Sequence, residues 1–507
     1  MSEVIDRRVT LGGETLGRGI IAGTRSRLEW AGMILTALPV LPLLLGAEFT
    51  WWRLLVALVI LGAAFLFWTP FPGLLGDRSI AGWIAGEVRF QVQRRREGEF
   101  VPAWLAAQDP SLTGVGYTVP AALGVVGAHT VTLATGEQAC VLRHSNPGRR
   151  HFYTVALEML GETAGVEAEW TFGSAHEEWG RFCAMLARPT SFIRTVQQVT
   201  RVVPYDTADH TKWVFDRIPD GVDDRLAESY VQLLDLVGDH TEQHRSWLVL
   251  RLPVSPRFSA AAAMIERGDD GELALVAREV SAAIPRARAH GLEVRALDER
   301  RLAAVIRALQ DASHPIDKIA GLDFERAWLP QDLRARRYVV VQGEGGPWFT
   351  RTAVVPRHGI EAGLFSPDFL HPLLSDVAPS VIRTISTVHD LLPAHIARKQ
   401  AKNDVTLDRS ATAEAASRVT DGSEGHQLTA STQRLVDLGA GKGNHGANWT
   451  VFITLAARSE QELATACGQI EDAAEAAHIT ELTYLDGQQG AGLVASLPLA
   501  RGMGVHK

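Results

Sequence analysis

Two long runs without a charged residue constrain this chain more than any other feature of its sequence. The first, WAGMILTALPVLPLLLGA, covers 18 residues from Trp30 to Ala47, and the second, LLVALVILGAAFLFWTPFPGLLG, covers 23 residues from Leu54 to Gly76. As helices these runs would reach about 27 Å and about 35 Å, against a bilayer hydrocarbon core of about 30 Å. The sequence therefore predicts a transmembrane helical hairpin over residues 30–76 that turns at residues 48–53.

Runs of this kind also occur in a buried helical hairpin of a soluble core and in a signal peptide. A signal peptide has a shorter apolar region and a small-residue cleavage site, and it does not occur as a pair. Basic residues flank the hairpin on both sides and are almost absent from its turn. By the positive-inside rule, this distribution predicts a multi-pass protein of the cell (inner) membrane with both termini in the cytoplasm. Residues 1–29 would then be a cytoplasmic basic arm.

The segment 77–100 has the composition of an amphipathic juxtamembrane helix. Ile80, Trp83, Ile84 and Val88 fall on one helical stripe, and the cluster at 94–96 is Arg-Arg-Arg. Such a helix suits the surface of an anionic leaflet. The alternative is an ordinary amphipathic helix packed on the soluble part of the protein.

The remainder of the chain alternates strand and helix patterns, which predicts a cytosolic body of the α+β class with mixed α/β domains. A strand at 246–252, a helix at 272–290 and a strand at 292–297 are followed about 200 residues later by a similar series at 449–455, 459–477 and 481–485. Two such units suggest duplicated ferredoxin-like modules, one in a first cytosolic region, 101–330, and one in a second, 331–507.

A search for catalytic chemistry finds no site, so we expect no enzyme, cofactor or metal. The Gly-rich run at 438–448 lacks the spacing of a phosphate-binding loop, because Gly443 follows Lys442 where Ser or Thr is required. His240 and His244 stand four apart, but at the junction of a helix and a strand. His144 and His151 suggest an exposed basic loop, and the carboxylate pairs at 223–224 and 269–270 suggest solvated turns.

Charge and cysteine content narrow the functional class further. The chain has 50 Lys+Arg and 58 Asp+Glu, a net charge of −8, and three scattered cysteines. An acidic surface repels phosphate, so we expect no direct contact with nucleic acid. Three cysteines are too few for a disulfide framework and suit a reducing compartment.

The order of parts resembles the membrane proteins encoded in actinobacterial conjugation loci. In these, a PrgI-type two-helix anchor is joined to a region like the amino-terminal half of a type IV secretion ATPase. The closing segments WTVFITL, CGQIEDAAEAAHI, ELTYLDGQQ and GLVASLPLARGM carry the most specific likeness. The chain stops at Lys507, so the resemblance implies that the motor domain is absent and gives no catalytic residues.

The resemblance implies a non-catalytic structural component of a conjugative, type IV-like secretion machine that docks a separate motor ATPase. Its expected partners are the lipid bilayer and other secretion-system subunits, in a homo- or hetero-oligomer. The interface candidates are Gln488, Gln489, Leu497, Pro498 and Leu499. Two alternatives stay open: an EccE-type membrane component of a type VII secretion system, which RSWLVLRL at 245–252 resembles, and a membrane-tethered enzyme with an unrecognised site.

Overall fold

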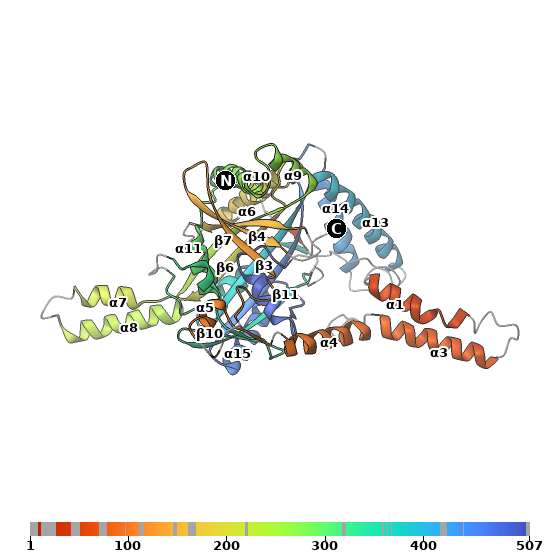
Figure 1. Ribbon diagram of the computed structural model, residues 1–507, viewed down its shortest axis with the longest axis horizontal. Helices are drawn as coiled ribbons and strands as arrows, with labels where there is room; N and C mark the ends of the chain where they lie inside the picture. The colour runs from red at the N-terminus through yellow and green to blue at the C-terminus, as the bar shows by residue number, and fades with distance from the viewer. Residues whose placement is uncertain are drawn as a thin grey trace, which may run out of the picture.

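The computed structural model shows a mixed α/β body from which two helical projections extend in opposite directions (Figure 1). It describes residues 9–11, 27–41, 51–69, 79–96, 98–109, 111, 116–145, 150–160, 169–217, 222–316, 321–356, 359–361, 363–366, 368–415, 423–439 and 441–502. One projection contains helices α1 (Arg27–Ala37) and α3 (Trp51–Trp68), which α4 (Ile80–Arg96) joins to the body. The other contains α7 (Ala208–Phe215) and α8 (Asp224–His240).

A single 13-stranded antiparallel sheet forms the centre of the body. Its order is β2-β9-β10-β11-β14-β13-β6-β7-β5-β4-β3, with β15 paired to β11 and β8 paired to β5. In the first part of the chain the strands are β2 (Glu99–Phe100), β3 (Val125–Thr132), β4 (Gln138–Ser145), β5 (Phe152–Met159), β6 (Thr195–Pro204), β7 (Glu242–Pro253) and β8 (Val294–Ala296). In the second part of the chain they are β9 (Gln331–Asp332), β10 (Val339–Gly343), β11 (Gly346–Val355), β13 (Ile382–Leu392), β14 (Gly446–Ala457) and β15 (Thr483–Tyr484). A separate short pair joins β1 (Val9–Leu11) to β12 (Gly363–Phe365).

The two halves of the sheet repeat one order of elements. In the first, β5, α6 (Glu169–Leu186), β6, β7, α10 (Asp269–Ala289) and β8 lie in the strand order β8-β5-β7-β6. In the second, β11, α12 (His371–Ser375), β13, β14, α15 (Glu460–Ala476) and β15 lie in the order β15-β11-β14-β13. The halves meet where β6 pairs with β13.

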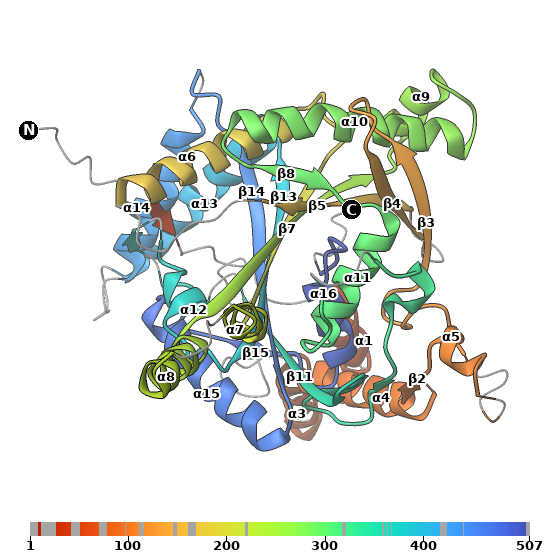
Figure 2. The same cartoon turned by 90° about the vertical axis from the view of Figure 1, so that its left-hand side faces the viewer.

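Helices cover both faces of this sheet. On one face, α6 and α10 enclose an apolar core over β5–β7, and α12 and α15 enclose another over β11–β14. The opposite face carries α11 (Glu299–Gln310), the 3-10 turn Phe324–Ala327 and α16 (Gln489–Ser496), which share a core with the closing residues 497–500. Figure 2 shows these two layers on either side of the central strands. The remaining helices are α5 (Ala103–Ala106), α9 (Pro256–Ala263), α13 (Ala394–Ala415) and α14 (Ser423–Asp437).

The predicted regions 101–330 and 331–507 are parts of one folded body. Strand β6 of the first pairs with β13 of the second over eight residues, from Thr195 opposite Asp390 to Val202 opposite Arg383. Leu497 and Leu499 also pack into the core of the first region, beside Leu123 and Trp247. The mixed α/β class is confirmed, but residue 330 does not separate two independent cores.

Candidate functional site: an apolar helical projection and its junction with the sheet

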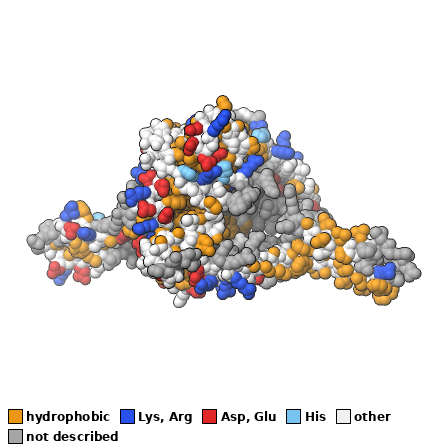
Figure 3. Space-filling model, in the orientation of Figure 1, with side chains coloured by type: hydrophobic (Ala, Val, Ile, Leu, Met, Phe, Trp, Pro, Cys, Tyr) orange, Lys and Arg blue, Asp and Glu red, His pale blue; other side chains and the backbone are white. Residues whose placement is uncertain are grey.

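Helix α3 is apolar along its length and lies largely outside the body. It has 18 residues with a mean hydropathy of 2.0, and 11% of them are buried. Leu55, Leu58 and Val59 are among its exposed side chains, and Figure 3 shows a continuous apolar surface over this projection. Large exposed apolar patches are rare on soluble monomers and are typical of surfaces that contact a partner protein or a membrane. Among the described residues, α3 is the one helix long and apolar enough to cross a membrane.

Helix α1 packs beside α3, and a glycine permits the contact. A Cβ atom added to Gly32 would lie 2.5 Å from the ring of Trp68, which is closer than real side chains approach. Because Gly32 lies in α1 and Trp68 ends α3, the two helices run in opposite directions (Figure 1). That they form a transmembrane hairpin remains a prediction.

The helix ends differ from those predicted for the spans Trp30–Ala47 and Leu54–Gly76. Helix α1 begins at Arg27 and ends at Ala37, with a turn at residues 38–39, and residues 42–50 lie outside the described part. Helix α3 begins at Trp51, inside the predicted turn, because nothing in Trp51–Arg53 breaks a helix. It ends at Trp68, since the residue before Pro70 is disfavoured in helical geometry. Residues 70–78, including Gly76, lie outside the described part.

Helix α4 is the junction between this projection and the sheet. The Ser79 hydroxyl accepts a hydrogen bond from the Gly82 N–H, which caps its first turn. Phe90 is buried against Gly487, where a backbone φ of +79° favours glycine over other residues. One turn earlier, Glu87 Oε2 lies 2.6 Å from Arg336 Nη1. The helix therefore docks on the second half of the sheet, as the alternative interpretation of segment 77–100 expected.

The opposite face of α4 keeps part of the predicted apolar stripe exposed. Ile84 and Val88 lie on this face with Val92, while the side chain of Trp83 lies outside the described residues. Helix α4 bridges the interval between α3 and the sheet (Figure 1). Arg94, near the carboxyl-terminal end of α4, lies at the body beside Leu333 and Ala335.

Four of the five interface candidates are inside the protein. Gln489, Leu497, Pro498 and Leu499 are buried, and Gln488 is exposed. The predicted contact surface is therefore wrong for these four residues, because α16 and the residues that follow it pack against the sheet. The Gln489 side chain accepts from the Thr352 N–H at 2.7 Å and donates to the Thr352 carbonyl at 3.3 Å, so it completes the backbone pairing of β11.

One glutamine, Gln197 of β6, makes several of the hydrogen bonds that hold the closing segment to the middle of the sheet. Its amide nitrogen lies 3.1 Å from the Ala495 carbonyl and 2.9 Å from the Leu497 carbonyl, and its oxygen accepts from the Ala500 N–H at 2.6 Å. The same nitrogen lies 2.7 Å from Ser386 Oγ on β13. Sequence reasoning missed Gln197, although a glutamine within an apolar strand signals a buried polar contact.

His144 is buried in strand β4 and not in an exposed basic loop. Its ring stacks on Phe152 at 4.6 Å between centroids, and Nε2 lies 2.8 Å from Thr154 Oγ1. Arg501 donates to Nδ1 at 3.1 Å. Burial first, and then the charges of Arg501 and Arg251, hold the pKa of His144 well below its usual range. His151 is partly exposed and pairs with Glu272 at 2.8 Å.

The neutral state of His144 predicts a loss of stability in mild acid. The unfolded chain binds a proton near pH 6.5 and the folded chain does so only at lower pH, so stability falls as pH decreases below about 6.5. We expect H144Q to reduce this slope by up to one proton, or about 1.4 kcal/mol per pH unit. Denaturant unfolding of the full chain in detergent between pH 5 and 7.5 measures the slope. H240Q, at an exposed histidine, controls for the loss of a histidine as such, and an unchanged slope in H144Q would contradict the assignment.

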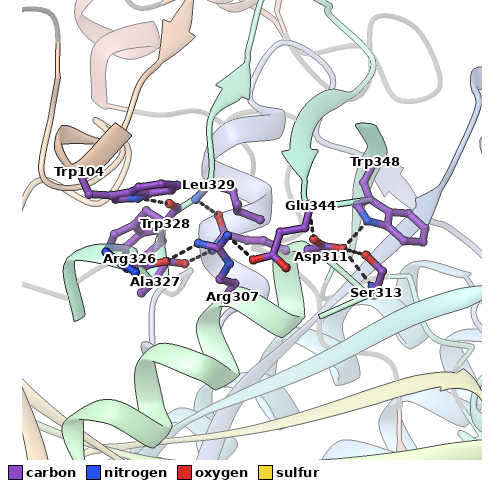
Figure 4. Close-up of polar contacts among 11 residues, drawn as sticks. Trp104, Arg307, Asp311, Ser313, Arg326, Ala327, Trp328, Leu329, Glu344 and Trp348 are labelled. Carbon is purple, nitrogen blue, oxygen red and sulfur yellow. Dashed lines mark hydrogen bonds and ion pairs between the residues drawn. The ribbon is translucent and has the colours of Figure 1, made fainter. Parts of the chain in front are cut away.

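The most elaborate polar cluster surrounds Arg307 and Asp311 at the end of α11 (Figure 4). The buried Arg307 guanidinium donates to the Arg326 carbonyl at 2.8 Å and to Glu344 Oε1 at 2.9 Å. Asp311 accepts from Trp348 Nε1 at 2.7 Å and from the Glu344 N–H at 2.9 Å. Burial alone would raise the pKa of Asp311, but these bonds and those from Ser313 lower it. The cluster ties α11 to the β10–β11 hairpin, which is a structural role.

The other candidate residues that the sequence suggested each have an ordinary structural contact. His240 bonds to the Leu236 carbonyl at the end of α8, whereas His244 in β7 lies 3.3 Å from Glu242. Asp223 caps α8, and Asp269 pairs with Arg143. In the part of the chain that the structure describes, no group of three metal-ligating side chains comes together.

No protein-family model matches the chain, and no curated protein matches its sequence.

Proposed function

We propose that this chain is a membrane-anchored structural subunit of a conjugative, type IV-like secretion machine, in which it docks a separate motor ATPase. The observation that carries the proposal is the exposed apolar surface of α3, a helix in which only 11% of the residues are buried. Inserted in a bilayer with α1 beside it, this surface would be removed from water. The body would then stand in the cytoplasm at the end of α4.

We also infer that the two halves of the body are copies of one ferredoxin-like module. Each half has two strand–helix–strand units whose four strands lie in the order 4-1-3-2, as β8-β5-β7-β6 and as β15-β11-β14-β13. Both copies carry a helical pair between their second and third strands, α7–α8 in one and α13–α14 in the other. A duplicated module of this kind offers a rigid platform and has two equivalent positions at which partners could bind.

Membrane insertion is tested by charging the centre of α3. We expect the full chain to stay in the membrane fraction after an alkaline wash and to dissolve in detergent. An arginine at the centre of a span costs about 2.5–3.5 kcal/mol. L58R/L61R should therefore move a large part of the protein into the wash. L407R, at an exposed leucine of α13, is the matched control. Release of the wild-type chain by the wash, or equal retention of both variants, would contradict the anchor.

The partner is tested separately, by purification in mild detergent from the native host. A conjugation motor ATPase in the complex supports the proposal, and the core membrane complex of a type VII system would favour the EccE-type alternative. The purified chain alone is expected to show no nucleotide turnover above background. Clear turnover would contradict the structural role and favour the membrane-tethered enzyme.

A further inference from the structure

The helical pair α7–α8 is an insertion into a β-hairpin that does not need it. Strands β6 and β7 are paired up to their ends, where Pro204 lies opposite Glu242. Residues 205–241 join these two positions with 37 residues, although a two-residue loop can close such a hairpin. Figures 1 and 2 show that this insertion, which we call the arm, projects away from the sheet on the side opposite α1 and α3.

The arm exposes large apolar side chains in a pattern. Leu226, Leu233 and Leu236 lie seven and then three residues apart, so they share one face of α8, and each is at least half exposed. Trp213 and Phe215 add exposed aromatic surface from α7. Exposed aliphatic and aromatic residues grouped in this way are typical of protein-binding surfaces.

The arm is also strongly acidic. Residues 205–240 hold nine carboxylates and three basic side chains, a net charge of −6 in a protein whose total is −8. This charge disfavours an anionic membrane or a nucleic acid as the bound surface. It also disfavours a second arm, because two arms face to face would repel each other. Charge complementarity favours a basic protein surface.

The base of the arm is fixed to the sheet by a buried ion pair. Glu242, the first residue of β7, accepts from both terminal nitrogens of Arg383 at 2.8 Å. Arg383 belongs to β13 and also donates to the Leu373 carbonyl at 2.9 Å. The arm therefore leaves the sheet from a fixed position, which lowers the entropy lost on binding a partner.

We propose that the arm is a docking surface for a partner protein that presents a basic, amphipathic helix. The apolar row on α8 would contact the apolar face of that helix, and the surrounding carboxylates would contact its basic residues. This inference deepens the proposed docking function by naming its surface. It does not depend on membrane insertion, so either can fail without the other.

The first test uses a defined probe and the full chain in nanodiscs of zwitterionic lipid. The probe is a labelled Leu/Lys peptide with helical amphipathic spacing, and the comparison peptide has every Lys replaced by Glu. We expect the Lys peptide alone to bind above empty nanodiscs, with affinity falling as salt increases. L226S/L233S/L236S should weaken binding at least tenfold, and D223N/D224N/E228Q should reduce its salt dependence. I396S/L407S/V436S, on the α13–α14 pair, is the matched control and should bind as wild type.

The second test keeps the arm intact and works in the native host. A photo-crosslinking residue at Leu233 should join the chain to a protein whose crosslinked segment is basic, and the same residue at Leu407 should not. Equal binding of both peptides, or unchanged binding by the leucine variant, would overturn the proposal. So would crosslinking from Leu233 to an acidic segment, to lipid or to a second copy. A variant with residues 205–241 replaced by Asn-Gly should remain folded and lose binding, whereas its unfolding would show that the arm serves the core instead.

Discussion

Replacing Arg383 with methionine is expected to destabilise the body by about 3–5 kcal/mol. Its side chain is completely buried and serves Glu242 and the carbonyls of Leu373, Leu374 and Val381. Methionine fills much of the same volume but leaves the Glu242 carboxylate without its guanidinium partner. Denaturant unfolding of the full chain in mild detergent, followed by tryptophan fluorescence, measures the loss.

A double variant separates the ion pair from packing at the same position. R383M/E242L removes both charges, so we expect it to be more stable than R383M alone. R434M provides the surface comparison, because Arg434 and Asp404 form a partly exposed pair at 3.4 Å that should contribute less than about 1 kcal/mol. Equal stability of R383M and R434M would show that the buried pair contributes no more than a surface pair.

The second large effect is expected from Q197L, which should cost about 2–4 kcal/mol. Leucine keeps most of the volume but leaves the Ala500 N–H without its acceptor. The carbonyls of Ala495 and Leu497 each lose one donor and keep another, from Ser386 and Leu499 respectively. Each of these two lost bonds contributes about 0.5–1.5 kcal/mol. Each buried polar group left unsatisfied costs about 1–3 kcal/mol. We expect unfolding at lower denaturant and faster proteolysis near residues 497–501, because this segment loses its contact with β6.

The neighbouring glutamine provides the control for this variant. Gln198 lies in the same strand and its side chain is on the other face of the sheet, so Q198L should change stability by less than about 1 kcal/mol. If Q197L and Q198L have equal effects, then the closing segment does not depend on Gln197. Q197E adds a further check, since it retains the acceptor for Ala500 but replaces the donor, and it should be as harmful as Q197L near neutral pH.

Local patterns in the sequence predicted several helices and strands because their signals lie within a few residues of one another. The Ser459 cap with Glu462 three residues later predicted a helix from 459, and α15 runs over Glu460–Ala476 with that cap in place. The alternation at 246–252 predicted a strand that β7 contains. Boundaries were less accurate, because Pro70 and the turn at residues 38–39 compete with a continuous apolar run.

The candidate interface was mispredicted because burial is not a local property. Among these residues, Gln489 is polar and Pro498 is a proline, and both types are common at surfaces. Nothing nearby in the sequence shows which segments cover them. Their partners are Thr352, 137 residues earlier, and Gln197, about 300 residues earlier. His144 and Arg501 are likewise far apart in the sequence, with a separation of 357 residues. The sequence near His144 therefore suggested an exposed loop, although the end of the chain covers this histidine.

By itself, the sequence determined the apolar run at 54–68 and the periodicity of several helices and strands. These depend on composition and on neighbours three or four residues away. Only the tertiary structure decided that α4 packs on the sheet through Phe90, that Arg383 and Gln197 bury their polar groups against distant segments, and that the apolar face of α8 stays uncovered. Those outcomes depend on which surfaces meet when β6 pairs with β13, and long-range pairing of that kind leaves no local trace in the chain.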